Sequence, residues 1–251
     1  MSLPRFHLPA AAWCSPHLTL TNDEAQHCGR VMRKQPGDEI EIFDGAGRVA
    51  VCEIVQVSKA EVQAKIVSES RVDPFQTAIH LLPALIKAEP FEWLLEKAVE
   101  LGAASILPIV TERTIVHLGG DHLEKKMTRW QRHMIESAKQ CHTPFITRLE
   151  KPQPLPQAIA DLPSSSLKII PALSEHSRTL HQVSGGLPSP TDAYLLIGPE
   201  GDFTPSEETL AQELGFIPVT LGPLILRAET AAISTLAVLR HELLRPVGNQ
   251  T

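Results

Sequence analysis

Two turns rich in glycine and proline, in the last quarter of the sequence, carry the residue types best suited to holding a ligand. The first is Gly198-Pro199-Glu200-Gly201, which follows an apolar run at 194–197, and the second is Gly222-Pro223, which follows a shorter apolar run at 217–221. Backbone groups in such turns can hydrogen-bond the polar edges of a ligand, while apolar neighbours flank its rings. In an open α/β sheet, ligands bind outside the carboxyl ends of the strands. We therefore predict a binding site at these two turns.

Three charged side chains accompany the turns and could do chemistry there: Glu200, Arg227 and Glu229. A guanidinium can stabilise developing negative charge, and a carboxylate can accept a proton. Simpler roles also fit these acids, since Glu229 would favour a helix N-terminus and Glu200 could cap its own turn. The usual nucleophilic and phosphate-binding motifs are absent (G-x-S-x-G, Walker A, H-E-x-x-H), and no histidines or cysteines have convincing ligand spacing, so we expect no metal.

Capping and turn residues predict the helices and strands that must position these side chains. Thr204-Pro205-Ser206-Glu207 predicts a capping box with proline at the first helical position, and Gly215 predicts the end of that helix. A strand at 217–221 and a final helix after Arg227 follow. Earlier in the chain, a strand at 79–86, a helix at 90–101 and a strand at 105–110 make a βαβ unit, which indicates an α/β domain with a parallel sheet.

The first part of the chain has a different character. Residues 1–73 contain several short alternating segments joined by turns, which predicts a small β-barrel domain, and residues 74–251 form the α/β domain. Residues 45–50 fit the dinucleotide fingerprint G-x-G-x-x-A, but a strand pattern follows them where a helix is required, so we interpret them as a hairpin turn.

Charge and composition exclude some classes of protein. The 251 residues carry a formal charge of −6, which argues against a protein that coats nucleic acid by bulk electrostatics. The four cysteines are scattered, which favours reduced thiols, and no apolar stretch reaches the length of a membrane span. A predicted helix at 121–140 carries cations off its apolar stripe, and that side faces either RNA or water.

Two separated motifs resemble the C-terminal signature of the SPOUT methyltransferases: GPEGDFTPSEE at 198–208 and LGPLILRAETAA at 221–232. More narrowly, the chain resembles the RsmE family, which methylates N3 of a uridine in small-subunit (16S) ribosomal RNA. The resemblance extends to residues 4–6 and 96–102. It implies a PUA-like β-barrel followed by an α/β trefoil-knot domain, S-adenosylmethionine as methyl donor, a homodimer, and a cytoplasmic location where ribosomal RNA is the partner.

The resemblance also implies the site residues. Arg227 is the first candidate for stabilising charge in catalysis, with Glu229 or Glu200 as proton acceptor or as the group that orients the donor, and the cations expected to contact RNA are Arg5, Arg30, Arg33, Lys34 and Arg129. The residues expected to bind the donor are Leu173, Leu196, Ile197, Gly198, Pro199, Glu200, Gly201, Leu221, Gly222, Ile225, Leu226, Arg227, Glu229, Thr230 and Ala231.

This sequence departs from the family pattern at three places. Asp202 replaces a common glycine and either narrows its loop or is capped locally. Leu224 replaces a frequent basic residue, and Cys141-His142 falls where a basic residue is usual nearby, which puts RNA contacts at both places in doubt. Two other functions stay open at this point: a methyltransferase acting on another RNA such as tRNA, and a non-catalytic RNA-binding assembly factor.

Overall fold

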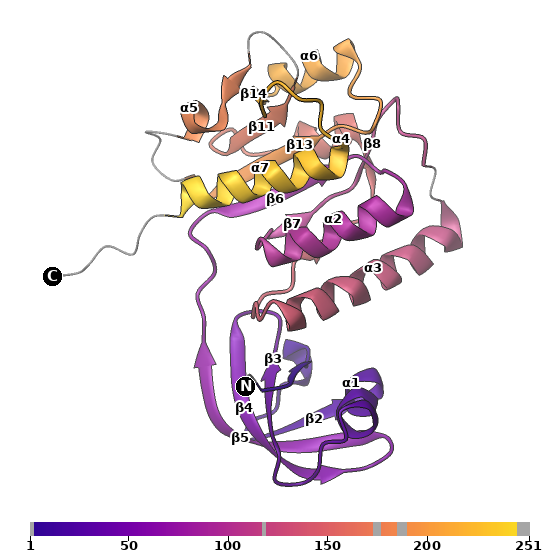
Figure 1. Ribbon diagram of the computed structural model, residues 1–251, viewed down its shortest axis with the longest axis vertical. Helices are drawn as coiled ribbons and strands as arrows, with labels where there is room; N and C mark the ends of the chain where they lie inside the picture. Colours follow the sequence, from indigo (N-terminus) through magenta and orange to yellow (C-terminus); the bar gives the residue numbers. More distant parts are fainter. Residues whose placement is uncertain (1–2, 117–118, 173–176, 185–189, 245–251) are drawn as a thin grey trace, which may run out of the picture. The chain divides into compact units, whose positions relative to one another are not determined.

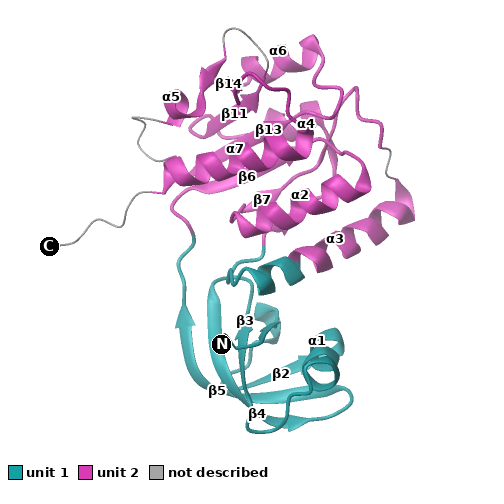
Figure 2. Ribbon diagram, in the orientation of Figure 1, with its two compact units in different colours: residues 1–74, 135–146 teal, residues 75–134, 147–251 magenta. Residues whose placement is uncertain are grey.

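The chain forms two compact units in this computed structural model, which describes residues 3–116, 119–172, 177–184 and 190–244 (Figures 1 and 2). Unit 1 comprises residues 1–74 and 135–146, and unit 2 comprises residues 75–134 and 147–251. Unit 1 therefore includes a segment, 135–146, that the sequence analysis placed in the second domain.

Unit 1 is built on a five-stranded sheet in which β1 pairs in parallel with β3 and the other pairs are antiparallel. The expected barrel is observed as a half-barrel, because the pairing order has β1 and β2 as its two edges in the described part of the chain. Alternating residues of the strands point into one buried apolar cluster, which includes Phe6, Leu20 and Ile42. In sheet order, the strands are β1 (Arg5–His7), β3 (Glu39–Phe43), β4 (Arg48–Val57), β5 (Glu61–Arg71) and β2 (His17–Thr21).

Short helical segments cover part of this sheet. They are a 3-10 turn (Ala10–Ala12), α1 (Asn22–Gln26) and a π-helical turn (His27–Val31). The hairpin between β3 and β4 confirms that residues 45–50 are not a dinucleotide motif. Asp44 Oδ1 accepts hydrogen bonds from the N–H groups of Ala46 (2.7 Å) and Arg48 (2.9 Å), and Gly45 and Gly47 have φ of 78° and 99°. Strand β4 begins at once after this turn, so no helix is available to hold a pyrophosphate.

Residues 135–146 belong to unit 1 because they close one side of its core. Lys139 is buried, with its Nζ 3.0 Å from Glu24 Oε1 and 3.0 Å from Glu136 Oε1, and its ammonium lies 5.8 Å from the Phe6 ring centroid. Further along, the N–H of Ile146 donates to the Gly45 carbonyl at 3.0 Å. Sequence-distant ion pairs and hydrogen bonds therefore complete the small unit.

Helix α3 (Gly120–Gln140) is followed by His142 in a left-handed conformation, with φ of 59°. A side chain at such a helix end costs conformational energy that glycine avoids, and the charged group found nearest is Glu41, 3.9 Å from His142 Nδ1. His142→Gly is therefore expected to raise the free energy of unfolding by about 0.5–1 kcal/mol in urea denaturation.

Thr143→Gly is the matched control. Thr143 has no positive φ, and its Oγ1 accepts the N–H of Phe145 at 3.3 Å. This second glycine should lower the free energy of unfolding, because it adds backbone freedom to the unfolded chain without relieving any strain. The same loss of stability in both variants would contradict the assignment of strain to His142.

Two of the four thiols are sealed in the core of unit 1. Burial raises the pKa of Cys28 to about 11 and that of Cys52 to about 12, whereas Cys14 is exposed. We expect iodoacetamide at pH 8 to modify Cys14 well before Cys28 or Cys52 in the folded protein, because the thiolate is the reactive form. Peptide mass spectrometry after a short pulse measures this order, and early modification of Cys52 would contradict it.

The raised pKa values of Cys28 and Cys52 also make the free energy of unfolding depend on pH in the alkaline range. In the unfolded chain these thiols ionise near pH 9, while in the folded chain they keep their protons to about pH 11–12. Between these values the folded state binds more protons, so the contribution of the two thiols to the free energy of unfolding falls as pH rises above 9. Replacing both by serine or alanine should flatten that part of the pH dependence.

Unit 2 contains a seven-stranded sheet in which every neighbouring pair is parallel, as the apolar runs predicted. Two further short strands, β8 (Ile109–Val110) and β10 (Gln153–Pro154), pair separately. In sheet order, the seven are β12 (Arg178–Thr179), β14 (Ile217–Thr220), β11 (Leu167–Pro171), β13 (Asp192–Ile197), β6 (Ala78–Pro83), β7 (Ser105–Ile106) and β9 (Arg148–Leu149).

Helices cover this sheet and bury its apolar side chains. One cluster joins α4 and α6 to sheet residues such as Leu82, Ile170 and Leu196, and α7 packs along β6 and β13 beside α2 (Figure 1). The predicted stripe of α3 is buried at Met127, Trp130, Met134 and Ala138. The remaining helices are α2 (Ala88–Glu100), α4 (Leu155–Ala160), α5 (Leu180–Ser184), α6 (Pro205–Glu213) and α7 (Ala228–Leu243).

The predicted ends of α6 are confirmed. Thr204 Oγ1 accepts the N–H of Glu207, Glu207 Oε2 accepts the N–H of Thr204 at 2.9 Å, and Pro205 is the first helical residue. Gly215 follows the helix with φ of 90°. These caps fix where α6 begins, and so fix the loop that leads into it from β13.

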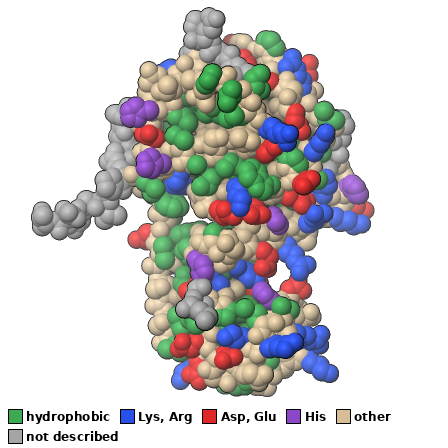
Figure 3. Space-filling model, viewed as in Figure 1, with side chains coloured by type: hydrophobic (Ala, Val, Ile, Leu, Met, Phe, Trp, Pro, Cys, Tyr) green, Lys and Arg blue, Asp and Glu red, His purple; other side chains and the backbone are tan. Residues whose placement is uncertain are grey.

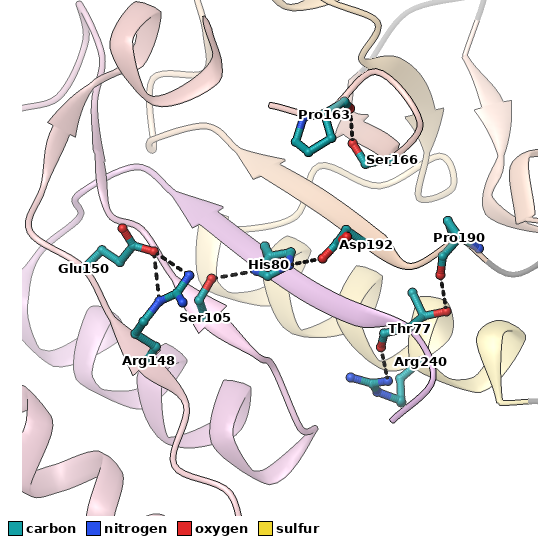
Figure 4. A network of polar contacts seen from close by, with 10 residues as sticks. All are labelled: Thr77, His80, Ser105, Arg148, Glu150, Pro163, Ser166, Pro190, Asp192 and Arg240. Carbon is teal, nitrogen blue, oxygen red and sulfur yellow. Dashed lines mark hydrogen bonds and ion pairs between the residues drawn. The ribbon is translucent and has the colours of Figure 1, made fainter. Parts of the chain in front are cut away.

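A buried arginine near the C-terminus of α7 connects this helix to residues just before β6 and just after α2. Arg240 donates from Nη1 to the Thr77 carbonyl (3.1 Å) and from Nη2 to the Gly102 carbonyl (2.6 Å), and its guanidinium lies 3.9 Å from the Phe75 ring centroid. Figure 4 shows Arg240 beside Thr77, whose hydroxyl donates in turn to the Pro190 carbonyl at 2.7 Å. The network connects segments that are far apart in the chain.

Among the described residues, no helix has the length and apolarity needed to cross a lipid bilayer. On the face seen in Figure 3, lysines and arginines are mixed with acidic side chains rather than gathered into one large field.

Candidate active site

A cavity of about 540 Å³ in unit 2 lies at the carboxyl edge of the parallel sheet. Strands β11 and β13 end at it with Pro171 and Ile197, and the segment after β14 enters it at Leu221. The start of α7 closes another side. These strands are neighbours and run parallel, so their carboxyl ends meet at one edge, as the position of the two turns predicted.

The first turn is held in shape by its own short hydrogen bonds. Asp202 has φ of 60°, its N–H donates to the Pro199 carbonyl at 3.0 Å, and its Oδ1 accepts the N–H of Phe203 at 2.8 Å. The departure from the family glycine is therefore capped locally. A Cβ on Gly198 would lie 3.2 Å from both Asp202 Oδ1 and the buried Phe203 ring, so a side chain at 198 would force one of these neighbours to shift by a few tenths of an ångström.

Five charged side chains line the cavity, two basic and three acidic: Lys87, Arg227, Glu200, Asp202 and Glu229. Arg227 is exposed and caps the N-terminus of α7 with an extended backbone, and no hydrogen bond from its side chain satisfies the helix end. Apolar walls come from Ile197, Leu221 and Leu226. A cavity with apolar walls, two turns of backbone and more acidic than basic side chains suits an aromatic ligand that also carries positive charge.

The structure brings most of the predicted donor-binding residues together. Leu196 is buried in the core below the cavity, Gly201 and Thr230 lie next to lining residues without lining it, and Leu173 lies outside the described residues. The predicted residues that do line it are Ile197, Gly198, Pro199, Glu200, Leu221, Gly222, Ile225, Leu226, Arg227, Glu229 and Ala231.

Several other residues that line the cavity were not predicted from the sequence. Lys87 directly precedes α2, Pro90 lies in the first turn of α2, and Pro171 and Ala172 lie at and just after the end of β11. Lys87 could have been predicted, because it lies between the predicted strand at 79–86 and the predicted helix from 90, and so at the same carboxyl edge of the sheet. The other missed residues are Asp202, Leu224 and Ala228.

The residues predicted to contact RNA differ in exposure. Arg30, Arg33 and Arg129 are exposed, and Lys34 is half-buried with Asp38 at 4.0 Å. Arg129 also pairs with Glu92 at 2.7 Å. Arg5, in contrast, is buried, with its Nε 2.9 Å from Glu41 and its guanidinium over the Phe43 ring. This buried position gives no support to an RNA contact.

A second polar cluster has the residue types of a hydrolytic triad. His80 Nδ1 lies 2.7 Å from Ser105 Oγ, and His80 Nε2 lies 2.9 Å from Asp192 Oδ1 (Figure 4). Ser105 is only 4% exposed, and the His80 ring is stacked on Tyr194. The cluster therefore ties three neighbouring strands together and offers no accessible nucleophile. Among the described residues, no group of three or more His, Cys, Asp or Glu side chains is placed to hold a metal ion.

Comparison with known families defines the class of protein. The model of an RNA methyltransferase domain matches residues 73–240, and that of an RNA methyltransferase PUA domain matches residues 20–67. Together with the parallel sheet and its edge cavity, these matches define an α/β RNA methyltransferase with an N-terminal PUA-like domain.

Relatives give the particular family. Ribosomal RNA small subunit methyltransferase E of Bacillus subtilis is 30% identical over 244 residues, which are 92% of this chain and 93% of that protein. The chain belongs to this methyltransferase family. The Neisseria gonorrhoeae enzyme of the same name, solved with bound S-adenosylmethionine, is 29% identical with a TM-score of 0.85, over 96% of this chain and 98% of that one. A Legionella pneumophila methyltransferase solved with the same cofactor is 34% identical with a TM-score of 0.87, over 96% and 98%.

Proposed function

We propose that this protein transfers a methyl group from S-adenosylmethionine to N3 of a specific uridine in 16S ribosomal RNA. One observation carries the proposal: the two separated C-terminal motifs converge on a single cavity at the carboxyl edge of the sheet. The family supports it further, because two structural relatives were solved with S-adenosylmethionine bound.

The cavity residues fit this donor. Leu221, Leu226 and Ile197 offer apolar walls for an adenine ring, while the backbone of the turns offers hydrogen-bonding groups. Glu200, Asp202 and Glu229 supply negative charge that favours a cationic ligand. When bound, S-adenosylmethionine supplies an electrophilic methyl group, so the chain's own residues have to position the reactants and manage charge.

Removing the proton from N3 and stabilising the resulting anion is the more demanding part of this reaction. N3 of uridine carries a proton at neutral pH and is hidden in a base pair, so the base has to be unpaired and the proton removed. We propose that Arg227 stabilises the negative charge that then spreads over O2 and O4. Glu200 or Glu229 accepts the proton or orients the donor, and both line the same cavity as Arg227.

Other parts of the chain serve the RNA substrate in this proposal. Residues 1–73 act as an RNA-binding PUA-like domain and residues 74–251 as a SPOUT domain with a trefoil knot. Arg30, Arg33, Lys34 and Arg129 are the proposed phosphate contacts, and Arg5 is left out because it is buried. Leu224 and Ile225 are 72% and 83% exposed at the cavity, which supports a homodimer in which a second copy covers them. The ribosomal RNA substrate puts the enzyme in the cytoplasm.

The test is to map the modification. Small subunits and naked 16S RNA from a strain lacking this activity are incubated with the full chain and labelled donor, and methylated positions are located by reverse transcription and nucleoside mass spectrometry. Label in 3-methyluridine at one 16S position is expected. Incorporation only into tRNA would move the function to another RNA, and donor binding without any incorporation would indicate an assembly factor.

A further inference from the structure

A tight turn directly after β8, residues 111–114, lies against the loop at 198–204, which contains Gly198 and Gly201 and lines the cavity. Thr111 and Thr114 close this turn on itself: the N–H of Thr111 donates to Thr114 Oγ1 at 2.9 Å, and the two hydroxyls are 2.9 Å apart. Both threonines are buried. The turn is therefore a firm support for the two residues between them, Glu112 and Arg113.

Arg113 contacts the loop itself, and Glu112 contacts the first turn of α6, which follows the loop. Arg113 Nη1 donates to the Gly201 carbonyl at 2.7 Å and to the Phe203 carbonyl at 3.3 Å. The N–H of Glu112 donates to Glu207 Oε1 at 2.8 Å, while the other oxygen of Glu207 caps α6. Turn 111–114 thus clamps residues 201–207 by three hydrogen bonds, two of them from a charged donor.

The clamped loop forms one wall of the cavity, but the clamp itself does not. Gly198, Pro199, Glu200 and Asp202 line the cavity, whereas Arg113 is not among the described lining residues. Glycines at 198 and 201 give this loop a flexible backbone, and Asp202 adopts a left-handed conformation that ordinary side chains disfavour. The loop's own hydrogen bonds involve the Pro199 carbonyl and the Asp202 side chain, and Arg113 adds support at the carbonyls of Gly201 and Phe203, which helps to keep one conformation before a ligand arrives.

We infer that Arg113 is a positioning residue for the donor site: it fixes the backbone of 198–204 so that the cavity is formed before the ligand binds. The role as a donor site rests on the proposed function, while the clamp itself does not. A guanidinium suits the task, because it stays charged and one group can serve two carbonyl oxygens. Its stem also packs beside Gly201, where an added Cβ would lie 3.5 Å from Arg113 Cβ and Cδ.

The first experiment measures the loop without any ligand. Amide hydrogen exchange of peptides covering 198–207 is followed in the full chain and in Arg113→Ala, Arg113→Lys and Arg148→Ala. Exchange at these amides should be at least about tenfold faster in Arg113→Ala, because hydrogen bonds from a charged donor are lost, with Arg113→Lys intermediate. Arg148→Ala is the matched control, since that exposed arginine forms an ion pair with Glu150 and belongs neither to turn 111–114 nor to the loop. Unchanged exchange in Arg113→Ala would overturn the inference.

The second experiment measures donor binding by calorimetry and steady-state kinetics on the same variants. Arg113→Ala should raise Kd and KM for S-adenosylmethionine about tenfold, with kcat changed less and the melting temperature within about 2 °C of the parent, and Arg113→Lys should recover part of the affinity. Faster loop exchange with unchanged Kd would overturn a role in donor binding. If the parent chain itself does not bind the donor, the proposed function fails, and the ligand-free exchange alone decides whether Arg113 holds the loop.

Discussion

Arg227→Ala is expected to lower kcat for methyl incorporation into small-subunit RNA by about 10²–10³-fold. Arg227 is an exposed cation at the start of α7, and it lines the cavity together with Glu200 and Glu229. A preorganised positive charge stabilises an anion on the uracil ring only once the N3 proton has left. Its loss should therefore reduce kcat more than it weakens donor binding, and calorimetry with S-adenosylmethionine separates the two effects.

Companion variants make this prediction specific. Arg227→Lys keeps the charge and should recover part of the rate, and Arg148→Ala, on an exposed arginine of unit 2 that pairs with Glu150, should leave it unchanged. Glu200→Gln and Glu229→Gln distinguish the two candidate acids, because only the proton acceptor should lose the acidic limb of the pH–rate profile. Methyl incorporation by Arg227→Ala at the parent rate would contradict the proposed mechanism.

The largest loss of stability is expected at Arg240. Its guanidinium donates to the carbonyls of Thr77, Gly102 and Leu101, and no carboxylate partner is found for it in the described part of the chain. Burial lowers the pKa of Arg240 to about 10, so the group is still charged at neutral pH. Arg240→Met fills similar space but leaves the buried Thr77 carbonyl and the part-buried carbonyls of Leu101 and Gly102 without this donor, which should lower the free energy of unfolding by about 2–4 kcal/mol.

Urea denaturation followed by circular dichroism measures this loss. Arg178→Met is a suitable control, because Arg178 also donates to a backbone carbonyl, that of Gln182 at 3.3 Å, but in an exposed position. That variant should change the free energy of unfolding by less than about 0.5 kcal/mol. Equal changes in the free energy of unfolding for the two substitutions would show that the buried hydrogen bonds of Arg240 do not contribute more to stability than the exposed one of Arg178.

Local signals predicted the local structure well. The capping box at Thr204 and Glu207, the glycine after α6 and the hairpin at 44–47 each depend on residues within a few positions of one another. The carboxyl-edge cavity followed from two turns after two buried strands, because parallel strands end on one side of a sheet. The roles of Arg227, Glu229 and Glu200 stay predictions, although the structure places all three around the same space.

What could not be predicted depends on contacts between distant segments. Arg5 reads as a surface cation near the start of the chain, yet Glu41 and the Phe43 ring bury it. Arg113 reads as a loop residue, and only the fold brings it to the carbonyls of Gly201 and Phe203. The apolar stripe of α3 is continuous from 127 to 138, so nothing along it indicates that the helix passes from one unit to the other at 134–135.

The split composition of unit 1 has a consequence for how the protein is made. Residues 75–134 leave the ribosome before residues 135–146, which carry the Lys139 partner of Glu24 and the Ile146 partner of Gly45. Domains commonly fold during synthesis in N- to C-terminal order. Here the sheet of unit 1 lacks the segment 135–146 until more than half of the polypeptide has been translated. A nascent chain released at residue 74 would expose the side of the unit 1 core that Lys139 covers.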